Sequence, residues 1–438
     1  MIIPDLDPVE GWHTMISLPI SNKPYMEDAP MLRELASQYR EMALSRRQRE
    51  LRELWRAHNS LAKTRIPVVC SWDEGSNLAG ELLAGTLRCS DPELRGYELF
   101  MRNSLYHAEM EDDWTYEPFL TVQSERKHPD FENGYGLWGQ KVKQKRIGQA
   151  FITVPTVRSI EDIGRLTVYD HEVDEAATTR RMEKFTDVFG DSIDLCLSRR
   201  PLYHRLGGCD LSTAMAELLG LENMMVDMAL DPELVHATAA WLRDATLKQF
   251  RQAEDNGDFT PHGGWWENEG TPYCDDLPDP SPLAGIHSAK KLWGFMAAQE
   301  FTLISPAMHK EFLFDYQKPI MEYFGLISYG CCENLTEKIE MLRDIPNLRR
   351  IGITLAANVK RCAEQIGESY VFAWRPNPSV VAAFFDRSVI RKQLREGLEA
   401  SRGCRVDIML KDVSTVQGEP ERLFEWVNIA RETAALFD

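Results

Sequence analysis

The chain contains one apolar run that stops abruptly at polar residues, Phe324-Gly-Leu-Ile-Ser-Tyr-Gly-Cys-Cys-Glu-Asn-Leu335. A short apolar run entered through Gly325 is typical of a buried strand, because strands buried on both faces are hydrophobic along their whole length. Asn334 is a suitable N-cap for a helix over residues 335–342. The run therefore predicts a strand, a polar loop and a helix, and α/β proteins commonly place their chemistry in such loops.

Three further units with the same order follow this run. Strands are predicted at residues 348–354, 369–374 and 405–410, and helices at 357–366, 388–401 and 420–436. Earlier apolar runs predict strands at 66–70, 118–122, 193–197 and 294–300. Strands that alternate with helices of this length indicate βαβ units and a parallel sheet. The predicted class is α/β, a (β/α)8 TIM barrel with an N-terminal helical extension; an open sheet is the alternative that the spacing leaves.

The length of 438 residues exceeds the roughly 250 residues of a minimal barrel. Residues 1–64 are predicted to be an N-terminal arm and helical extension, and residues 65–438 to be the barrel. The charged, weakly periodic part at about 123–185 is predicted to be an insertion. The first 30 residues carry prolines and no periodicity, so we interpret them as an extended arm that could reach a partner subunit of a homodimer.

Charge and composition argue against several classes of protein. The net charge of −18 would repel nucleic-acid phosphates and anionic lipids, since affinity for such polyanions comes mainly from Lys and Arg. No basic segment precedes an apolar core after Met1, and no run of apolar residues is long enough to span a membrane. We therefore expect a cytoplasmic protein without a membrane or nucleic-acid partner. Its nine cysteines are expected to be thiols rather than a disulfide framework.

Nucleotide-binding and common metalloprotease motifs are weak or absent in the sequence. Residues 134–139, Gly-Tyr-Gly-Leu-Trp-Gly, match GxGxxG, but no predicted strand precedes them and no acidic residue on a following strand completes a dinucleotide site. GxxxxGK[ST], HExxH and CxxC do not occur. The sequence therefore lacks the usual signs of nucleotide hydrolysis, zincin and thioredoxin chemistry.

Residues 257–278 are dense in Gly, Pro and aromatic side chains. Such a segment cannot form a regular element, and it is too apolar to be a simple linker, so we expect a functional loop over the barrel mouth. Its residues Trp265, Trp266 and Tyr273 are candidates for holding a planar or ring-shaped ligand. His287 and Glu300 follow, and Glu300 ends the strand predicted at 294–300.

Four motifs resemble, in order and spacing, the carboxyl half of the uroporphyrinogen decarboxylase superfamily: Tyr329-Gly-Cys-Cys-Glu-Asn, Ile345-Pro-Asn-Leu-Arg-Arg-Ile, Trp374-Arg-Pro-Asn-Pro and Leu410-Lys-Asp-Val-Ser-Thr. The resemblance extends from about Cys196 to the C-terminus and implies the barrel fold. It implies either the decarboxylase or the corrinoid-dependent methyltransferases of the same superfamily. We expect the first methyltransferase of an O-demethylase system, which moves a methyl group from an aryl methyl ether, such as a methoxybenzene, to cobalt. No corrinoid-binding Asp-x-His-x-x-Gly occurs, so the corrinoid would arrive on a partner protein.

The methyltransferase branch implies a zinc site, and the present chain departs from its ligand pattern. That branch commonly holds zinc through His-x-Cys and a later cysteine. Here Tyr329 replaces the histidine, Cys331 matches the first cysteine, and Lys411 or Asp412 lies near the position of the second. Cys331, Glu333 and Asp412 are the candidate zinc ligands, because zinc accepts sulfur and carboxylate donors. The alternative is that Cys331 and Cys332 are small buried residues at a tight turn.

Without a metal, demethylation of an aryl ether needs a general acid for the departing phenolate. The candidate acids at strand ends are Glu333, Asp412, His287 and Glu300. The resemblance adds Tyr329, Trp374 and Asn377 to the expected substrate-binding side chains.

Other activities remain as alternatives: transfer from methylcorrinoid to tetrahydrofolate or a thiol, uroporphyrinogen decarboxylation, and a non-catalytic ligand-binding barrel. The decarboxylase alternative is weakened because Lys411-Asp-Val lacks the histidine of that branch. In a non-catalytic barrel, the carboxylates at the mouth would all be paired with arginines.

Overall fold

The computed structural model describes residues 25–71, 82–83, 85–128, 131, 133–142, 144–147, 150–203, 210–259, 270–282 and 288–438. The strands in these ranges are β1 (Val68–Cys70), β2 (Phe119–Gln123), β3 (Gln144–Ile147), β4 (Ala150–Thr153), β5 (Asp194–Ser198), β6 (Trp293–Met296), β7 (Leu326–Tyr329), β8 (Leu348–Ile353), β9 (Val371–Trp374) and β10 (Arg405–Leu410).

The α-helices of the same ranges begin with α2 and end with α17. They are α2 (Ala29–Ala43), α3 (Arg46–Asn59), α5 (Pro92–Ala108), α6 (Ile160–Ile163), α7 (Glu175–Phe189), α8 (Ser212–Leu219), α9 (Leu221–Leu230), α10 (Pro232–Asn256), α11 (Pro306–His309), α12 (Asp315–Met321), α13 (Ile339–Leu342), α14 (Val359–Ile366), α15 (Ser379–Ala382), α16 (Arg387–Ala400) and α17 (Glu421–Ala434). None of these described helices combines the length and the apolar character needed to cross a bilayer.

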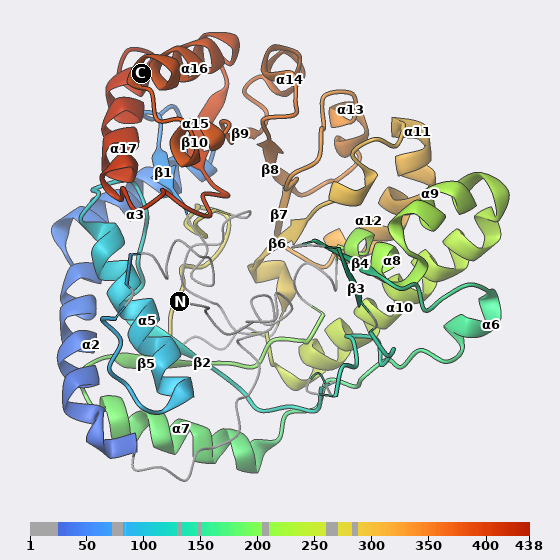
Figure 1. Ribbon diagram of the computed structural model, residues 1–438, viewed down its shortest axis with the longest axis horizontal. Helices are drawn as coiled ribbons and strands as arrows, with labels where there is room; N and C mark the ends of the chain where they lie inside the picture. The colour runs from blue at the N-terminus through green and yellow to red at the C-terminus, as the bar shows by residue number, and fades with distance from the viewer. Residues whose placement is uncertain are drawn as a thin grey trace.

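Six parallel strands form the main sheet, in the order β1-β10-β9-β8-β7-β6. The first strand of the chain thus pairs with the last. In Figure 1 the strands β10 to β7 follow one another around the middle of the molecule, with α14, α16 and α17 outside them. A separate parallel pair, β2 and β5, and an antiparallel hairpin, β3 and β4, complete the strands of the described ranges. The expected parallel α/β architecture is therefore confirmed.

A single closed sheet of eight strands, in contrast, does not occur among the described residues. The free edge of β1 is occupied by the segment that precedes β2 rather than by β2 itself. The backbone N–H of Val68 donates to the Asp113 carboxylate (2.8 Å), and that of Cys70 donates to the Asp112 carboxylate (2.9 Å). The N–H of Asp113 donates in turn to the carbonyl of Val68 (2.9 Å). Two side chains thus satisfy backbone donors that a neighbouring strand would otherwise satisfy.

The expected strands coincide with the observed ones to within a few residues, and the strand expected at 405–410 is β10 without a shift. The strand expected at 294–300 stops at Met296, because Gln299–Phe301 form a short 3-10 helix. The helix expected at 335–342 is shortened to α13. Asn334 does not cap it; its side chain accepts from the N–H of Thr336 (3.0 Å) in a turn that precedes the helix.

The two faces of the main sheet differ in polarity. Ile351, Phe372 and Ile408 belong to the large apolar core that the outer helices share. Side chains alternate between the faces of a strand, so Arg350 and Asp407, which neighbour these residues in sequence, lie on the opposite face. Both are fully buried, and the Arg350 guanidinium lies 2.9 Å from the Asp407 carboxylate.

Helix α3 covers this polar face near the amino ends of β8 and β10. His58 lies 3.1 Å from the Asp407 carboxylate, and the Asn59 side chain accepts from Arg350 (2.8 Å). Trp55 packs in a cluster with Val69, Tyr273 and Met409. Helix α3 thus covers the sheet near the amino ends of the strands. A functional site is therefore expected near their carboxyl ends.

The buried charges couple this packing to pH. Burial alone would raise the pKa of Asp407, but Arg350 and the bond from His58 outweigh it and lower that pKa. Burial also lowers the pKa of His58, although Asp407 opposes the effect. Both groups therefore bind fewer protons in the folded than in the unfolded state. Their contributions to stability are present above their unfolded pKa values and are lost as the pH falls through the folded ones.

Replacement of Arg350 by Met is expected to lower the free energy of unfolding by about 3–5 kcal/mol, because Asp407 would keep a buried charge without its main partner. Urea unfolding monitored by circular dichroism measures this difference. Arg391→Met is the matched control, since Arg391 pairs with Glu432 on the surface and should cost less than about 1 kcal/mol. Equal losses in the two variants would show that the Arg350–Asp407 pair has no special importance.

Candidate functional site

The loop after β7 has a backbone that only glycine suits. Gly330 has φ +109°, and a Cβ there would lie 2.9 Å from the Leu335 side chain and 3.1 Å from the carbonyl oxygen of Gly352. The φ value lies in the region that L side chains rarely adopt, so another residue would be strained. The loop can therefore turn sharply and present Cys331 and Cys332 directly at the carboxyl end of β7.

Arg375, the residue after β9, fixes this loop from across the sheet. Its buried guanidinium donates from Nη1 to the carbonyl oxygens of Gly330 (2.9 Å) and Cys331 (3.0 Å). Gly352 of the intervening strand β8 leaves the space for this contact, because a Cβ there would collide with the guanidinium. The carboxyl ends of β7, β8 and β9 are thus joined by one side chain.

Glu333 holds the same loop from the other side. Its carboxylate is fully buried and accepts from the N–H of Ala298, after β6, and from the N–H of Cys331, both at 2.8 Å. Each carboxylate oxygen thus accepts a hydrogen bond from one backbone N–H, so Glu333 holds the loop in place. We predicted Glu333 as a general acid and zinc ligand; the geometry gives it the role of positioning Cys331.

The reactive groups at this end are two thiols and an ammonium group. Cys331 Sγ lies 3.5 Å from Cys332 Sγ and 3.8 Å from Lys411 Nζ, which follows β10. Cys331 is buried beside Phe295 and Ala297, Cys332 is exposed, and Lys411 is buried. Lys411 Nζ also lies 3.5 Å from the carboxylate of Asp412, whose side chain is half-exposed.

The two thiols titrate differently because of this environment. The hydrogen bond between the two thiols lowers the pKa of Cys332 to about 7; burial and Asp412 oppose the shift, and Lys411 and Arg375 support it. The same bond, together with burial, raises the pKa of Cys331. The shared hydrogen bond thus lowers the pKa of the exposed thiol, Cys332, and raises the pKa of the buried one, Cys331.

Two aromatic residues that we predicted to bind substrate point into the helical layer instead. The Tyr329 hydroxyl donates to Gln317 of α12 (3.0 Å) and lies 3.2 Å from His309 of α11. Trp374 packs against Gly397 of α16, where an added Cβ would collide with its ring. Both side chains are buried, and their position gives them a structural role.

Tyr273 and Asn377 also have local partners. The Tyr273 hydroxyl donates to the buried carboxylate of Glu117 (2.6 Å), within the cluster that α3 covers. Asn377 accepts from the N–H of Ser379 (3.0 Å) in the turn that leads into α15. The structure therefore places neither side chain among the partners of Cys331, Cys332 and Lys411.

Glu300 lies at the carboxyl end of β6 but faces α8. Its carboxylate accepts from the hydroxyls of Ser212 (2.7 Å) and Thr213 (3.1 Å). Burial, reinforced by the charge of Glu300, raises the pKa of Glu217 on α8 to about 7. Glu300 is thus part of a second polar group, distinct from the thiols. The predicted residues His287, Trp265 and Trp266 lie outside the described residues.

The described residues do not make a zinc site. No group of three His, Cys, Asp or Glu side chains in the described part of the chain is placed to hold a metal ion. Cys331 and Cys332 offer two sulfurs, the oxygens of Glu333 are taken by backbone donors, and the Lys411 ammonium next to Cys331 would repel a divalent cation.

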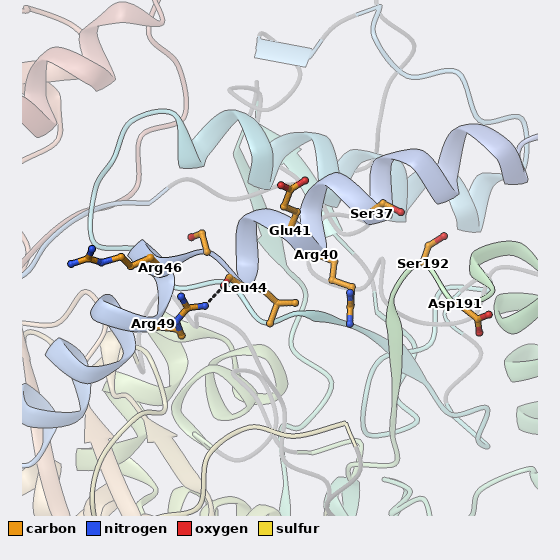
Figure 2. A pocket seen from close by; sticks show the side chains of 9 residues that line it. Ser37, Arg40, Glu41, Leu44, Arg46, Arg49, Asp191 and Ser192 are labelled. Atoms are coloured by element: carbon orange, nitrogen blue, oxygen red, sulfur yellow. Dashed lines mark hydrogen bonds between the residues drawn. The ribbon is translucent and has the colours of Figure 1, made fainter.

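A cavity of about 620 Å³ lies elsewhere, between α2, α3 and the start of β5 (Figure 2). Its lining includes Arg40, Arg46 and Arg49 together with Asp191 and Ser192. Arg46 pairs with Glu50 (2.7 Å), and Arg49 donates to the carbonyl of Leu44 (2.6 Å). Both contacts are exposed to solvent, and the cavity contains none of the predicted site residues.

Sequence reasoning did not assign Cys332, Arg375 or Lys411 to the site. A signal for them was present, because each follows a predicted strand by one to three residues. The carboxyl ends of neighbouring parallel strands meet at one edge of a sheet, so polar residues just after them are brought together.

Comparison with known proteins adds little to these observations. No protein-family model matches the chain, and no curated protein matches it in sequence. A methyltransferase from Methanosarcina mazei is among the solved structures that resemble it, with a TM-score of 0.48 and 12% identity over 87% of this chain and 98% of that chain. A likeness this remote carries no functional information by itself.

Alkylation of Cys332 by iodoacetamide is expected to reach half its maximal rate near pH 7, because the thiolate is the nucleophile and the pKa of Cys332 is lowered to about 7. Mass spectrometry with fragmentation between residues 331 and 332 measures the rate. Lys411→Met should move the midpoint upward. If the rate in the wild type reached half its maximum at a pH of about 8.5, the pKa of an ordinary thiol, the lowered pKa of Cys332 would be contradicted.

Gly352→Ala is expected to lower the free energy of unfolding by about 1–3 kcal/mol, because the new Cβ would overpack the Arg375 guanidinium and lie 2.7 Å from the Gly330 carbonyl oxygen. Thermal and urea unfolding measure the change. Gly96→Ala, on an exposed part of α5 with open space around its Cβ, is the control and should raise stability by about 0.5–1 kcal/mol. Similar stability of the two variants would refute the close contact at Gly352.

Proposed function

We propose that the chain is a methyltransferase that moves a methyl group from a small methylated donor to the cobalt of a corrinoid carried by a partner protein. The proposed reaction site is the carboxyl end of β7 and β10. The proposed donor is an aryl methyl ether. The strands β1, β2 and β5–β10 are proposed to form an eight-stranded barrel that is interrupted between β1 and β2 and between β5 and β6. Support comes from the resemblance of residues 329–334, 374–378 and 410–415, which follow or end β7, β9 and β10.

The position of Lys411 is the observation that carries the proposal. When a methyl group leaves an aryl ether, the C–O bond breaks, the electron pair stays on oxygen, and a phenolate develops. A fixed positive charge next to that oxygen lowers the barrier, because the charge is stronger in a site sheltered from water. In the methyltransferases that the sequence resembles, a zinc ion supplies this charge. Here the buried ammonium of Lys411, 3.8 Å from Cys331 Sγ, would supply it. Lys411 would then donate a proton to the phenolate oxygen, so that a phenol leaves, and would regain a proton from the solvent.

The surroundings of Lys411 support a functional rather than a structural end of the sheet. Asp412, the next residue, has φ +61°, and strained backbone of this kind in a non-glycine residue is found preferentially at active sites. A non-catalytic barrel would pair the carboxylates of the mouth with arginines. Glu333 and Glu300 are instead bound by backbone and hydroxyl donors.

Lys411→Met is expected to lower kcat by about 10²-fold with little change in KM, since the ammonium would act on charge that develops only in the transition state. The assay supplies reduced cobalamin as a free acceptor and methoxybenzenes as donors, and it measures released phenol by chromatography and methylated cobalamin by absorbance. Lys392→Met is the control, because Lys392 lies on the exposed face of α16.

Methylamines and methylated thiols are tested as donors under the same conditions, because the donor class is part of the proposal. Turnover that is equal in Lys411→Met and wild type would remove the proposed role of Lys411. Absence of methyl transfer from all three donor classes would contradict the proposed function as a whole.

A further inference from the structure

We propose that Cys331 and Cys332 form a chelating dithiol site for a neutral, trivalent metalloid hydroxide, of which arsenous acid is the simplest. The two sulfurs lie 3.5 Å apart at the carboxyl end of β7. Two sulfurs on one pyramidal trivalent arsenic, with bonds of about 2.3 Å and an S–As–S angle of about 100°, are separated by about 3.5 Å, so the observed spacing suits two donors to one such atom. This site goes beyond the proposed methyl transfer and does not depend on it.

A shared third atom suits this pair better than a direct disulfide does. The Cα atoms of adjacent residues are about 3.8 Å apart across a trans peptide, whereas an unstrained disulfide needs about 4.4–6.8 Å. Direct oxidation of the pair would therefore store strain. An atom that binds both sulfurs fits their 3.5 Å separation, so no disulfide strain arises.

The charge of the surroundings selects for a neutral ligand. Lys411 Nζ lies 3.8 Å from Cys331 Sγ, and the Arg375 guanidinium binds the carbonyl of the same residue. Both positive charges disfavour a divalent cation at the sulfurs. Arsenous acid is uncharged at neutral pH, so it approaches the thiols without this repulsion.

The loop holds the two thiols ready for binding. Glu333 fixes the N–H of Cys331, and Arg375 fixes its carbonyl oxygen, so little backbone freedom is lost when a ligand binds. Cys332 is exposed and provides the first contact, after which Cys331 closes the chelate.

The binding step conserves atoms and oxidation state. Two S–H bonds and two As–O bonds break, two As–S bonds form, and two molecules of water leave. Arsenic stays trivalent and keeps one hydroxyl group. No oxidant or reductant is needed.

The test uses the full-length, reduced protein and sodium arsenite. We expect a 1:1 adduct in intact mass spectrometry that survives desalting and is removed by excess dimercaptopropanol but not by mercaptoethanol. Cys332→Ser should bind at least about 10²-fold more weakly, because it loses the effective concentration that the second thiol provides. Circular dichroism confirms its folding, and Cys331→Ser provides a second variant at the buried position.

Cys404→Ser is the matched control, since Cys404 is a partly exposed cysteine on another loop, and its variant should bind arsenite as wild type does. Absence of an adduct in the wild type, or an adduct that persists in Cys332→Ser, would overturn the proposal. Zinc binding that displaces arsenite at equal concentration would overturn the selectivity for a neutral ligand. Each outcome is independent of methyl-transfer activity, because the protein is assayed for binding alone.

Discussion

The hydrogen bonds from Arg375 to the carbonyl oxygens of Gly330 and Cys331 determine the shape of the candidate site. Arg375 follows β9 and the two carbonyls follow β7, so the bonds pass over β8, which lies between these strands. They require Gly352 on β8, where any larger residue would displace the guanidinium, and they require the positive φ of Gly330. One side chain thereby holds the loop where Cys331 Sγ lies 3.8 Å from Lys411 Nζ.

The polar face of the sheet carries buried charges near both ends of the strands, and the charges have different partners at the two ends. Near the amino ends, Arg350 meets Asp407, and α3 closes over the pair with His58 and Asn59. Near the carboxyl ends, Arg375 binds carbonyl oxygens and Lys411 lies beside a thiol and the half-exposed Asp412. The first arrangement is a closed, structural one. The arrangement at the carboxyl ends places exposed groups next to a buried positive charge. Such an arrangement lowers stability, and it is expected of a functional site.

Much of the architecture could be predicted from the sequence, because buried parallel strands appear as short apolar runs between amphipathic helices. The strand at 405–410 and the order of units after residue 324 were predictable in this way. The interruption between β1 and β2 was not, since nothing in the sequence indicates that Asp112 and Asp113 fold back to bind the backbone of β1. Adjacent carboxylates after a helix look the same whether they are solvated or buried.

The candidate site was only partly predictable for a related reason. Cys331 and the ends of β7 and β10 were identified, but the face on which a side chain lies depends on the exact register of a strand. Tyr329 and Trp374 belong to motifs that suggested ligand binding, and the register turns both toward the helices. Arg375 and Lys411 lie in two of these motifs but were given no role at the site, because only the neighbouring strands bring them to Cys331.

A crystal structure of the reduced protein tests the central claim most directly, because the claim is the convergence of Cys331, Cys332 and Lys411 at one end of the sheet. The account predicts Lys411 Nζ about 4 Å from Cys331 Sγ, with the Arg375 guanidinium on the carbonyls of Gly330 and Cys331. A Lys411 side chain directed into solvent, with Cys331 packed among apolar residues away from any cation, would contradict it.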